Sequence, residues 1–331
     1  MAVQGSVVVV TGASAGVGRA TALRLAREGW RVGLIARDAA ALRALAAEIR
    51  AAGGLALPLP CDVAEAEAVF DAADRAEREL GPIEAWVNNA MVTVFAPVTA
   101  LTPEEFRRVT EVTYLGTVHG SMAALRQMRP RGRGVLLQVG SALAYRGIPL
   151  QSAYCGAKHA IVGFTDSLRA ELRHEGSGIA VTEVHLPAVN TPQFGWARTR
   201  LPHAPRPAGG TVTADTAARA IAAALRRPVR EVWLGGSSLV AILGNMLAPV
   251  LADRHLGRNG VQGQMDDRPL DRPPEGNLFE PVPGRHRTDG DYPGRDGALR
   301  LSGQAARLGA AGLGLAAAGL AGWLLGRGGP R

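Results

Sequence analysis

Residues 6–18 read SVVVVTGASAGVG, and this stretch decides the fold of the chain. Its first half is a run of apolar, mainly β-branched residues, which predicts a strand covered on both faces. Its second half is a glycine-rich turn, followed from about Val17 to Glu28 by a stretch that predicts a helix. Glycines let such a turn bend sharply and approach a pyrophosphate, which the amino end of the helix then faces. The stretch therefore predicts a dinucleotide site, with a purely structural turn as the alternative.

The same alternation of strand and helix continues along the chain. Further strands are predicted at 31–36, 55–59, 84–87, 134–139 and 179–186, and further helices at 39–52, 64–80, 103–128 and 151–174. Strands that alternate with helices of this length indicate parallel βαβ units. The sequence therefore predicts the α/β class, with a doubly wound parallel sheet in one catalytic domain over residues 1–256.

The chain has 37 basic residues, and Lys158 is the only lysine among them. Tyr154 lies four positions earlier, so on a helix the two side chains share one face. A compact ammonium differs from the planar fork of arginine, and its retention here indicates a site that needs a point charge. A phenol beside it is suited to general acid-base chemistry. The alternative is a chance pair on a solvated helix.

Charge and cysteine content narrow the class of protein. The net charge is +8 and the pI is about 10.5, but the arginines are scattered among acidic residues and aromatic residues are scarce. We therefore expect no nucleic-acid partner. Two cysteines, Cys61 and Cys155, suggest no disulfide framework. Residues 1–5 run into the first strand without a signal-peptide pattern, so we expect a cytoplasmic protein.

Four groups of residues, in this order, resemble the motifs of the short-chain dehydrogenase/reductase family. They are Thr11-Gly12-x-x-x-Gly16-x-Gly18, Asn88-Asn89-Ala90, Ser141 and Tyr154-x-x-x-Lys158, and the resemblance covers roughly residues 5–235. It implies a Rossmann-type catalytic domain, a nicotinamide cofactor and hydride transfer between an alcohol and a carbonyl. It also implies a homo-oligomer, a small-molecule alcohol or carbonyl substrate and no metal.

The resemblance assigns the catalytic residues. Ser141 follows a predicted strand, so its hydroxyl lies where ligands of such sheets bind, and it would bond the substrate oxygen. Tyr154 would transfer that oxygen's proton, and Lys158 would lower the pKa of Tyr154 and hold the nicotinamide ribose. Thr113 stands where the family has the asparagine of its proton relay. A threonine can hold a water there but offers fewer hydrogen bonds.

The end of the second strand bears on the choice of cofactor. By alignment Arg37 takes the position beside the ribose 2′ group, where an arginine accommodates a phosphate, so NADP is favoured. Asp38 follows it and keeps NAD open, and a solvated loop arginine is a further alternative. The full set of residues implied to bind the cofactor is Gly12, Ser14, Gly16, Val17, Gly18, Arg37, Asp62, Val63, Asn89, Ala90, Tyr154, Lys158, Pro187 and Thr191.

Other positions depart from the family or bear on the substrate. Met91 replaces the glycine that usually follows Asn-Asn-Ala, and Pro187-Ala188 replaces Pro-Gly. Residues 191–206 would form the lid of the pocket, and Phe194 and Trp196 in it favour a lipophilic substrate, with plain packing as the alternative. Tyr145 and Met91 are further candidates to line the site.

The resemblance fades past residue 235. An amphipathic helix is predicted over 237–255, closing the pocket or forming an oligomer contact. Residues 257–300 are dense in Gly, Pro and charge, which predicts a flexible linker, with a meandering coil as the alternative. Residues 301–331 are predicted to hold an apolar helix, whose uncharged part at 308–326 would span about 28 Å. We expect a membrane anchor on the cytoplasmic face, with an apolar helix in solution or a Gly/Ala tail as the alternative.

The function predicted from the sequence is that of an NADP-dependent oxidoreductase acting on a lipophilic alcohol or ketone. A protein of another class, a non-catalytic dinucleotide-binding redox sensor or membrane scaffold, is the alternative. The joint presence of Ser141, Tyr154 and Lys158 argues against it, because a protein that only binds the nucleotide has no need of that arrangement.

Overall fold

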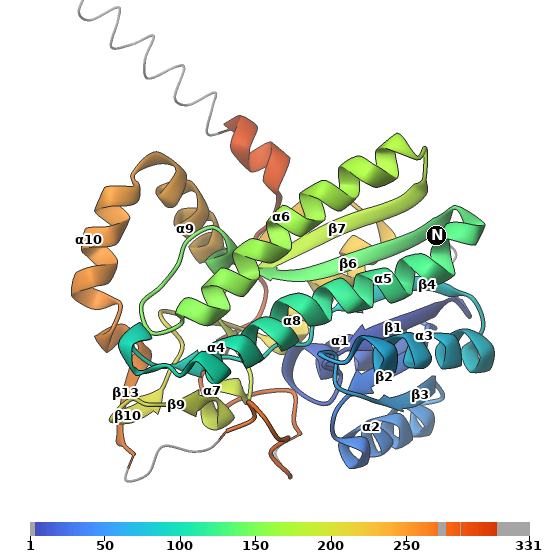
Figure 1. The fold of residues 1–331 in the computed structure, drawn as a ribbon, viewed down its shortest axis with the longest axis horizontal. Helices are drawn as coiled ribbons and strands as arrows, with labels where there is room; N and C mark the ends of the chain where they lie inside the picture. Colours follow the sequence, from blue (N-terminus) through green and yellow to red (C-terminus); the bar gives the residue numbers. More distant parts are fainter. Residues whose placement is uncertain (1–3, 271–275, 285, 310–331) are drawn as a thin grey trace, which may run out of the picture.

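A computed structural model describes residues 4–270, 276–284 and 286–309 of the chain. Its centre is an eight-stranded sheet in the order β15-β12-β7-β6-β4-β1-β2-β3 (Figure 1). The strands are β1 (Val7–Thr11), β2 (Arg31–Ala36), β3 (Leu55–Pro60), β4 (Ile83–Asn88), β6 (Arg133–Ser141), β7 (Gly178–Leu186), β12 (Glu231–Leu234) and β15 (Arg300–Ser302). All neighbours pair in parallel except β15, which runs antiparallel to β12. This is the predicted Rossmann-type doubly wound fold.

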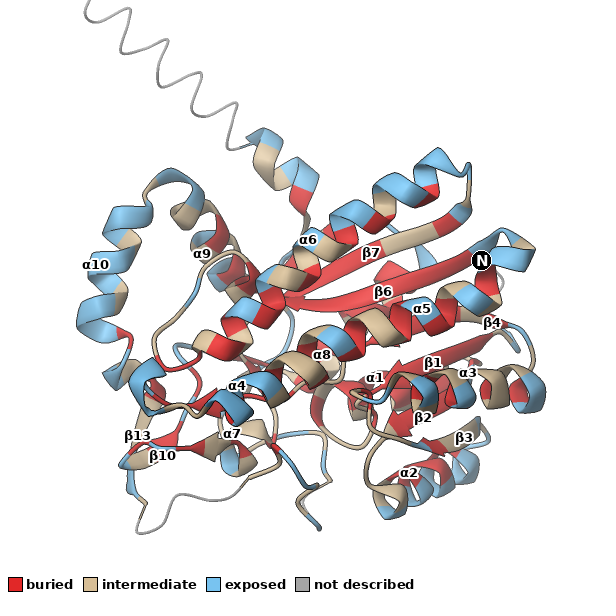
Figure 2. Ribbon diagram, viewed as in Figure 1, coloured by how far each residue is buried: buried red, intermediate tan, exposed pale blue. Residues whose placement is uncertain are grey.

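Helices cover both faces of the sheet. One face carries α1 (Gly16–Arg27), α2 (Ala39–Ala51) and α8 (Ala214–Arg226), and the other carries α3 (Ala66–Leu80), α5 (Gly116–Met128) and α6 (Ser152–His174). Along β1, Val8 and Val10 pack into the first layer while Val7 and Val9 pack into the second. β1 is therefore buried along its whole length, the central strands are largely buried, as Figure 2 shows, and the prediction of a sheet covered on both faces is confirmed.

The predicted elements of residues 6–186 are present, with bounds that differ by one or two residues. The long helix predicted over 103–128 consists of α4 (Pro103–Thr110), a π-helical turn (Glu111–Leu115) and α5 without interruption. Thr102 caps its start, accepting a hydrogen bond from the Glu105 amide while the Glu105 carboxylate accepts one from the Thr102 amide. This reciprocal capping satisfies two amides that the first turn leaves without a partner.

The helix predicted over 237–255 is two helices, and the prediction of one was wrong. They are α9 (Gly236–Leu247) and α10 (Pro249–Asn259), which meet at Ala248. Pro249 has no amide hydrogen and its ring clashes with a preceding turn, so the helix stops and starts again there. Much of α10 is exposed, as its pale blue colour in Figure 2 shows.

The prediction of a flexible linker at 257–300 was wrong for the residues that the structure describes. β13 (Met265–Pro269) pairs with β10 (His203–Pro205), and β14 (Gly294–Arg295) pairs with β11 (Thr211–Thr213), which also pairs with β8 (Val189–Asn190). The segment then enters the main sheet as β15. Leu278 and Gln264 on it are completely buried. The segment has too few apolar residues for a core of its own, and it packs on the catalytic domain instead.

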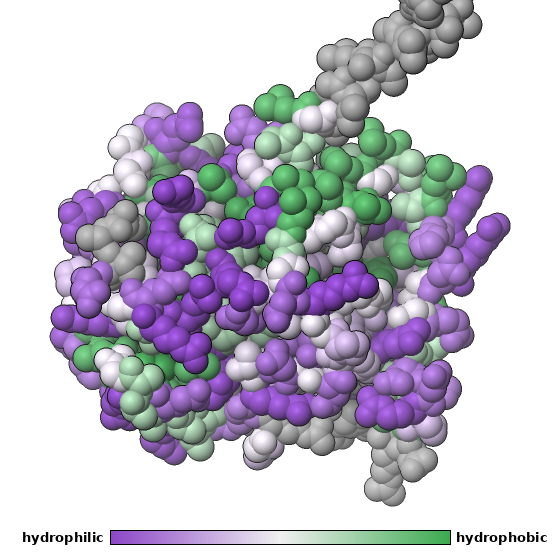
Figure 3. Space-filling model, turned by 180° about the vertical axis from the view of Figure 1, so that it is seen from behind, coloured by the Kyte–Doolittle hydropathy of each residue, from purple (hydrophilic) through white to green (hydrophobic). Residues whose placement is uncertain are grey.

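Three further small elements lie close to the pocket. They are β5 (Val94–Phe95), which pairs with β9 (Arg198–Thr199), and the short helix α7 (Gln193–Trp196). Hydrophilic side chains are spread over the face seen in Figure 3, in keeping with the scattered charges of the sequence. Within the described part of the chain, no helix combines the length and the apolar character that crossing a bilayer requires. Most of the predicted anchor, from residue 310 on, lies outside the described residues.

Candidate active site

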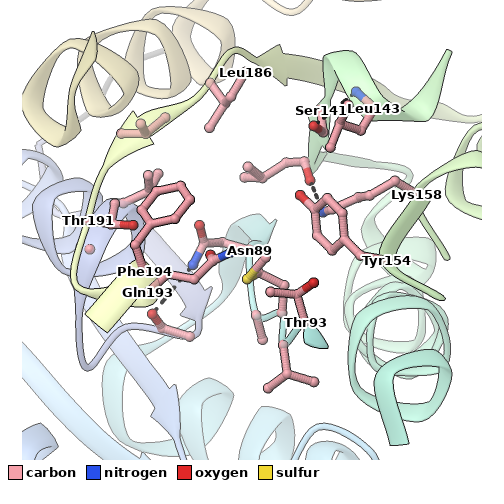
Figure 4. A pocket seen from close by; sticks show the side chains of 18 of the residues that line it. Asn89, Thr93, Ser141, Leu143, Tyr154, Lys158, Leu186, Thr191, Gln193 and Phe194 are labelled. Carbon is pink, nitrogen blue, oxygen red and sulfur yellow. Dashed lines mark hydrogen bonds between the residues drawn. The ribbon is translucent and has the colours of Figure 1, made fainter. Parts of the chain in front are cut away.

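A cavity of about 480 Å³ lies at the carboxyl ends of β1, β2, β4, β6 and β7, where doubly wound folds bind ligands. Ser141, Tyr154 and Lys158 stand on one side of it, and Thr191, Gln193 and Phe194 stand on the opposite side (Figure 4). Of the residues implied to bind a cofactor, Gly12, Ser14, Gly16, Val17, Arg37, Asp62, Val63, Asn89, Ala90, Tyr154, Lys158, Pro187 and Thr191 line the cavity. The fold therefore brings together almost all of the predicted site.

The glycine-rich turn is shaped by close approach of the main chain. A Cβ at Gly18 would lie 2.1 Å from the carbonyl oxygen of Gly12, and Gly12 itself has a φ of +67°. Below the turn, the Thr11 hydroxyl accepts hydrogen bonds from the amides of Asn89 at 2.9 Å and Ala90 at 3.0 Å. Gly18 does not line the cavity, and its part in the site is to let the turn close.

Asn88 and Asn89 have different surroundings. The Asn89 amide group donates to the Thr11 carbonyl at 2.9 Å and lines the cavity. Asn88 is buried below, where its amide group donates to Gln138 at 2.9 Å and to Ser121 at 3.1 Å. Asn88 therefore supports the strand ends and does not contact the cavity.

The three catalytic candidates meet at the end of β6 and the start of α6. The Ser141 hydroxyl accepts a hydrogen bond from the Leu143 amide at 3.1 Å and lies close enough to Tyr154 to lower the pKa of its phenol. Lys158 Nζ donates to the Val139 carbonyl at 2.7 Å and lies 5.7 Å from the centre of the Tyr154 ring. The side chains are therefore held by the main chain on either side of the Tyr154 phenol.

Burial dominates the electrostatics of this group. It raises the pKa of Tyr154, against a lowering by the Ser141 hydrogen bond. Burial also lowers the pKa of Lys158 to about 8, although the charge of Glu183 acts in the opposite direction. Without other charges the phenol is therefore the stable form of Tyr154 near neutral pH.

Thr113 does not reach the cavity. It is completely buried in the π-helical turn, and its hydroxyl accepts from the Val92 amide at 3.2 Å and donates to the Val92 carbonyl at 3.1 Å. Its neighbour Val112 lines the cavity instead. In the structure Thr113 therefore ties the helix to the loop that carries Met91 and Val92.

At the part of the cavity near the ends of β2 and β3, three predicted residues have partners within the chain. The guanidinium of Arg37 donates to the carbonyls of Asn277, Leu278 and Phe279. Asp38 caps α2 by accepting from the Ala41 amide at 2.9 Å. Asp62 accepts from the Ala64 amide at 3.0 Å and pairs with Arg108.

Of the four residues predicted to face the substrate, the structure places three at the cavity. Phe194 and Trp196 line the cavity, as does Met91. Tyr145 does not, and its prediction as a lining residue was wrong. Its hydroxyl donates to the Glu231 carboxylate at 2.7 Å, and the same carboxylate forms an ion pair with Arg307.

Part of the wall comes from beyond residue 235. Sequence reasoning found the helical portion, as the predicted helix over 237–255 that closes the pocket, and missed the portion after β13. Ser237, Ser238 and Ala241 of α9 and Leu256 of α10 line the cavity, as do Asn277, Pro281, Val282 and His286 of the segment after β13. The apolar pattern of α9 was a signal that it closes the pocket. The later residues have no motif and no periodicity, so no pattern could have found them.

Comparison with known proteins gives consistent matches. The family described as short chain dehydrogenase matches residues 6–200. The "uncharacterized oxidoreductase YxnA" of Bacillus subtilis is 33% identical over 282 residues, covering 85% of this chain and 79% of that protein. The "short-chain reductase protein NovJ" of Streptomyces niveus is 40% identical over 198 residues, covering 60% of this chain and 74% of that protein.

A solved structure has a similar fold. It is an alcohol dehydrogenase from the archaeon Thermococcus sibiricus, in complex with 5-hydroxy-NADP. It superposes with a TM-score of 0.62 at 28% sequence identity and covers 69% of this chain and 95% of that one.

Proposed function

The chain belongs to the short-chain dehydrogenase family of NAD(P)-dependent oxidoreductases, and on that premise we propose that it uses NADP to reduce a lipophilic ketone. The proposal assigns to Tyr154 the role of general acid, to Ser141 that of holding the substrate oxygen, and to Lys158 that of holding the nicotinamide ribose. The observation that carries it is the meeting of these three side chains with the glycine-rich turn in one cavity.

The residues fit a bound dinucleotide. Gly16 and Val17 at the amino end of α1 line the cavity, and such an end attracts a pyrophosphate; the Gly16 amide itself donates to the Arg287 carbonyl, so Val17 and the residues after it face the anion. An ammonium has three N–H donors, and among the described residues Lys158 has one hydrogen-bond acceptor, the Val139 carbonyl. Two donors of Lys158 therefore remain for ribose hydroxyls. The reduced cofactor would supply the hydride.

The protein supplies the proton. Ser141 and Tyr154 would bind the carbonyl oxygen of the substrate, and as the carbonyl carbon accepts the hydride, the Tyr154 hydroxyl gives its proton to that oxygen. The product is an alcohol, and the phenolate left behind is stabilised by the Lys158 ammonium. Since burial favours the protonated phenol, Tyr154 holds the proton that reduction of a carbonyl requires near neutral pH.

Two observations support the finer parts of the proposal. Arg37 follows the end of β2, where an arginine receives a 2′-phosphate. The wall around the reacting end contains Met91, Leu143, Ile148 and Phe194, which favours a lipophilic substrate.

The test uses the full chain and a screen of ketones with NADPH or NADH. Tyr154→Phe should keep its affinity for NADPH, because the cofactor is held mainly elsewhere, and should lose about 10²–10⁴-fold in turnover. Tyr114→Phe removes the same hydroxyl from a tyrosine that does not line the cavity and should leave turnover unchanged. Full turnover in the Tyr154 variant would refute the acid role, and a folded protein that binds neither nucleotide would refute the proposal as a whole.

A further inference from the structure

Residues 276–284 and 286–289, here called the strap, form one wall of the cavity near the end of β2 (Figure 1, the orange and red chain that passes beside α7). Leu278 anchors the strap, because its side chain is completely buried in the core layer below. The Asn277 amide donates to the Trp196 carbonyl at 2.9 Å, and a Cβ at Gly276 would lie 2.4 Å from the Arg198 amide nitrogen. These close contacts fix the strap against the lid.

The strap reaches both residues at the end of β2. Its carbonyls at Asn277, Leu278 and Phe279 hold the guanidinium of Arg37. Its His286 places Nε2 2.8 Å from the Asp38 carboxylate, with both side chains more than four-fifths buried (15% and 17% exposed). His286 also lines the cavity, and its ring centre lies 5.9 Å from that of Trp196.

The contact between His286 and Asp38 changes how the Asp38 carboxylate can interact with the ribose 2′ group of a bound dinucleotide. A free carboxylate at this place accepts a hydrogen bond from a 2′-hydroxyl and repels a 2′-phosphate. Here one oxygen of Asp38 is engaged by the Ala41 amide and the other by His286. Arg37 keeps the capacity to bind a phosphate, because a guanidinium has five N–H donors and the three carbonyls engage only two of Nη1 and one of Nη2.

We propose that His286 is a specificity residue for the cofactor: it occupies the Asp38 carboxylate, so that a dinucleotide with a 2′-phosphate is accepted beside Arg37 and one with a 2′-hydroxyl gains no bond from Asp38. The proposal rests on the proposed use of NADP. It assigns a role in cofactor choice to a segment outside the matched family region, which ends at residue 200.

The test is a fluorescence titration of the full chain with NADPH and with NADH. In His286→Ala the Asp38 carboxylate is released, so the dissociation constant for NADPH should rise about tenfold while that for NADH stays constant or falls. His255→Ala, on the exposed face of α10, removes an imidazole away from the cavity and should change neither constant.

A double-mutant comparison separates this role from simple packing. In an Asp38→Asn background the acid is gone and the cap of α2 is retained, since asparagine is also a good cap. There, His286→Ala should change the ratio of the two constants less than about twofold. A tenfold change in that background would show that His286 acts without Asp38, and would overturn the proposal.

Other outcomes are equally decisive. An unchanged ratio of the two dissociation constants in His286→Ala overturns the proposal, and so does an equal gain of affinity for both nucleotides, which would show that the strap obstructs the site.

If His286→Ala does not fold, Asp38→Asn alone gives the answer. It should alter the ratio less than about threefold if His286 already occupies the acid, and a strong shift toward NADPH would refute this. Binding of neither nucleotide to the unaltered chain would be a failure of the proposed function instead.

Discussion

The catalytic region of the molecule, residues 6–235, and the C-terminal segment, of which the structure describes residues 257–270, 276–284 and 286–309, build one cavity in different ways. In the first, each strand packs on the helix that follows it, and motifs of a few residues supply the chemistry. In the second, the contacts that matter join positions far apart, such as Arg37 with Phe279, 242 positions later, and Asp38 with His286, 248 positions later. A segment that is poor in apolar residues can therefore be well packed when another surface receives it.

The largest expected effect tests that packing directly. Leu278 is completely buried, although it belongs to the segment that the sequence predicts to be a linker. Leu278→Ala should lower the free energy of unfolding by about 2–4 kcal/mol, because a buried leucine loses transfer free energy and leaves a cavity. Urea unfolding of the full chain measures it.

The matched control is Leu299→Ala in the same segment, since Leu299 is 57% exposed. It should change the free energy of unfolding by less than about 0.5 kcal/mol. Equal and small effects of the two substitutions would mean that the segment does behave as a linker, and the contrast between the two regions would be lost.

The second effect concerns a charge that the C-terminal segment brings to the sheet. Arg307 pairs with Glu231, whose carboxylate is 3% exposed and also accepts from Tyr145 at 2.7 Å and Trp233 at 3.0 Å. Burial raises the pKa of Glu231, but these hydrogen bonds more than offset it and the pKa is lowered. Arg307→Ala should cost about 1–2 kcal/mol at pH 7, a modest figure because Arg307 is partly exposed.

The stability that Arg307 contributes through Glu231 should depend on pH in a definite direction. A carboxyl group whose folded-state pKa is lowered stabilises the fold above its unfolded pKa of about 4.3, and this contribution is lost as the pH falls. The difference between Arg307→Ala and the unaltered chain should therefore be present at pH 7 and shrink below about pH 4. Urea unfolding at several pH values measures it. Arg254→Ala, at an exposed position of α10, serves as the control, and a difference that grows in acid would contradict the assignment.

The two regions also show how much of the fold and of the candidate site can be predicted from the sequence. The sheet, the glycine-rich turn and the meeting of Ser141, Tyr154 and Lys158 are predictable because strand and helix periods and short motifs are local signals. The break at Ala248 could have been predicted from Pro249. Thr113 and Tyr145 were misplaced because the sequence does not show which partner each hydroxyl finds in the folded chain. His286 was beyond prediction, since only the folded chain brings it to Asp38.

The smallest expected effect separates the side chains of the strap from its main chain. The Gly16 amide at the amino end of α1 donates to the Arg287 carbonyl at 3.0 Å. The Arg287 side chain points elsewhere and pairs with Asp291, with both side chains more than half exposed. Arg287→Ala keeps the carbonyl, so it should change the free energy of unfolding by less than about 0.5 kcal/mol and the affinity for NADPH by less than about twofold.

Arg287→Ala is thus the counterpart of His286→Ala one position along the strap. One variant removes the His286 side chain and the other removes the Arg287 side chain. Both keep the hydrogen bond from the Gly16 amide to the Arg287 carbonyl. If the affinity for NADPH fell equally in both, the strap would act through its overall position and not through the pairing of His286 with Asp38. A fall in His286→Ala alone would locate the specificity in one imidazole, contributed by the region that the sequence motifs do not reach.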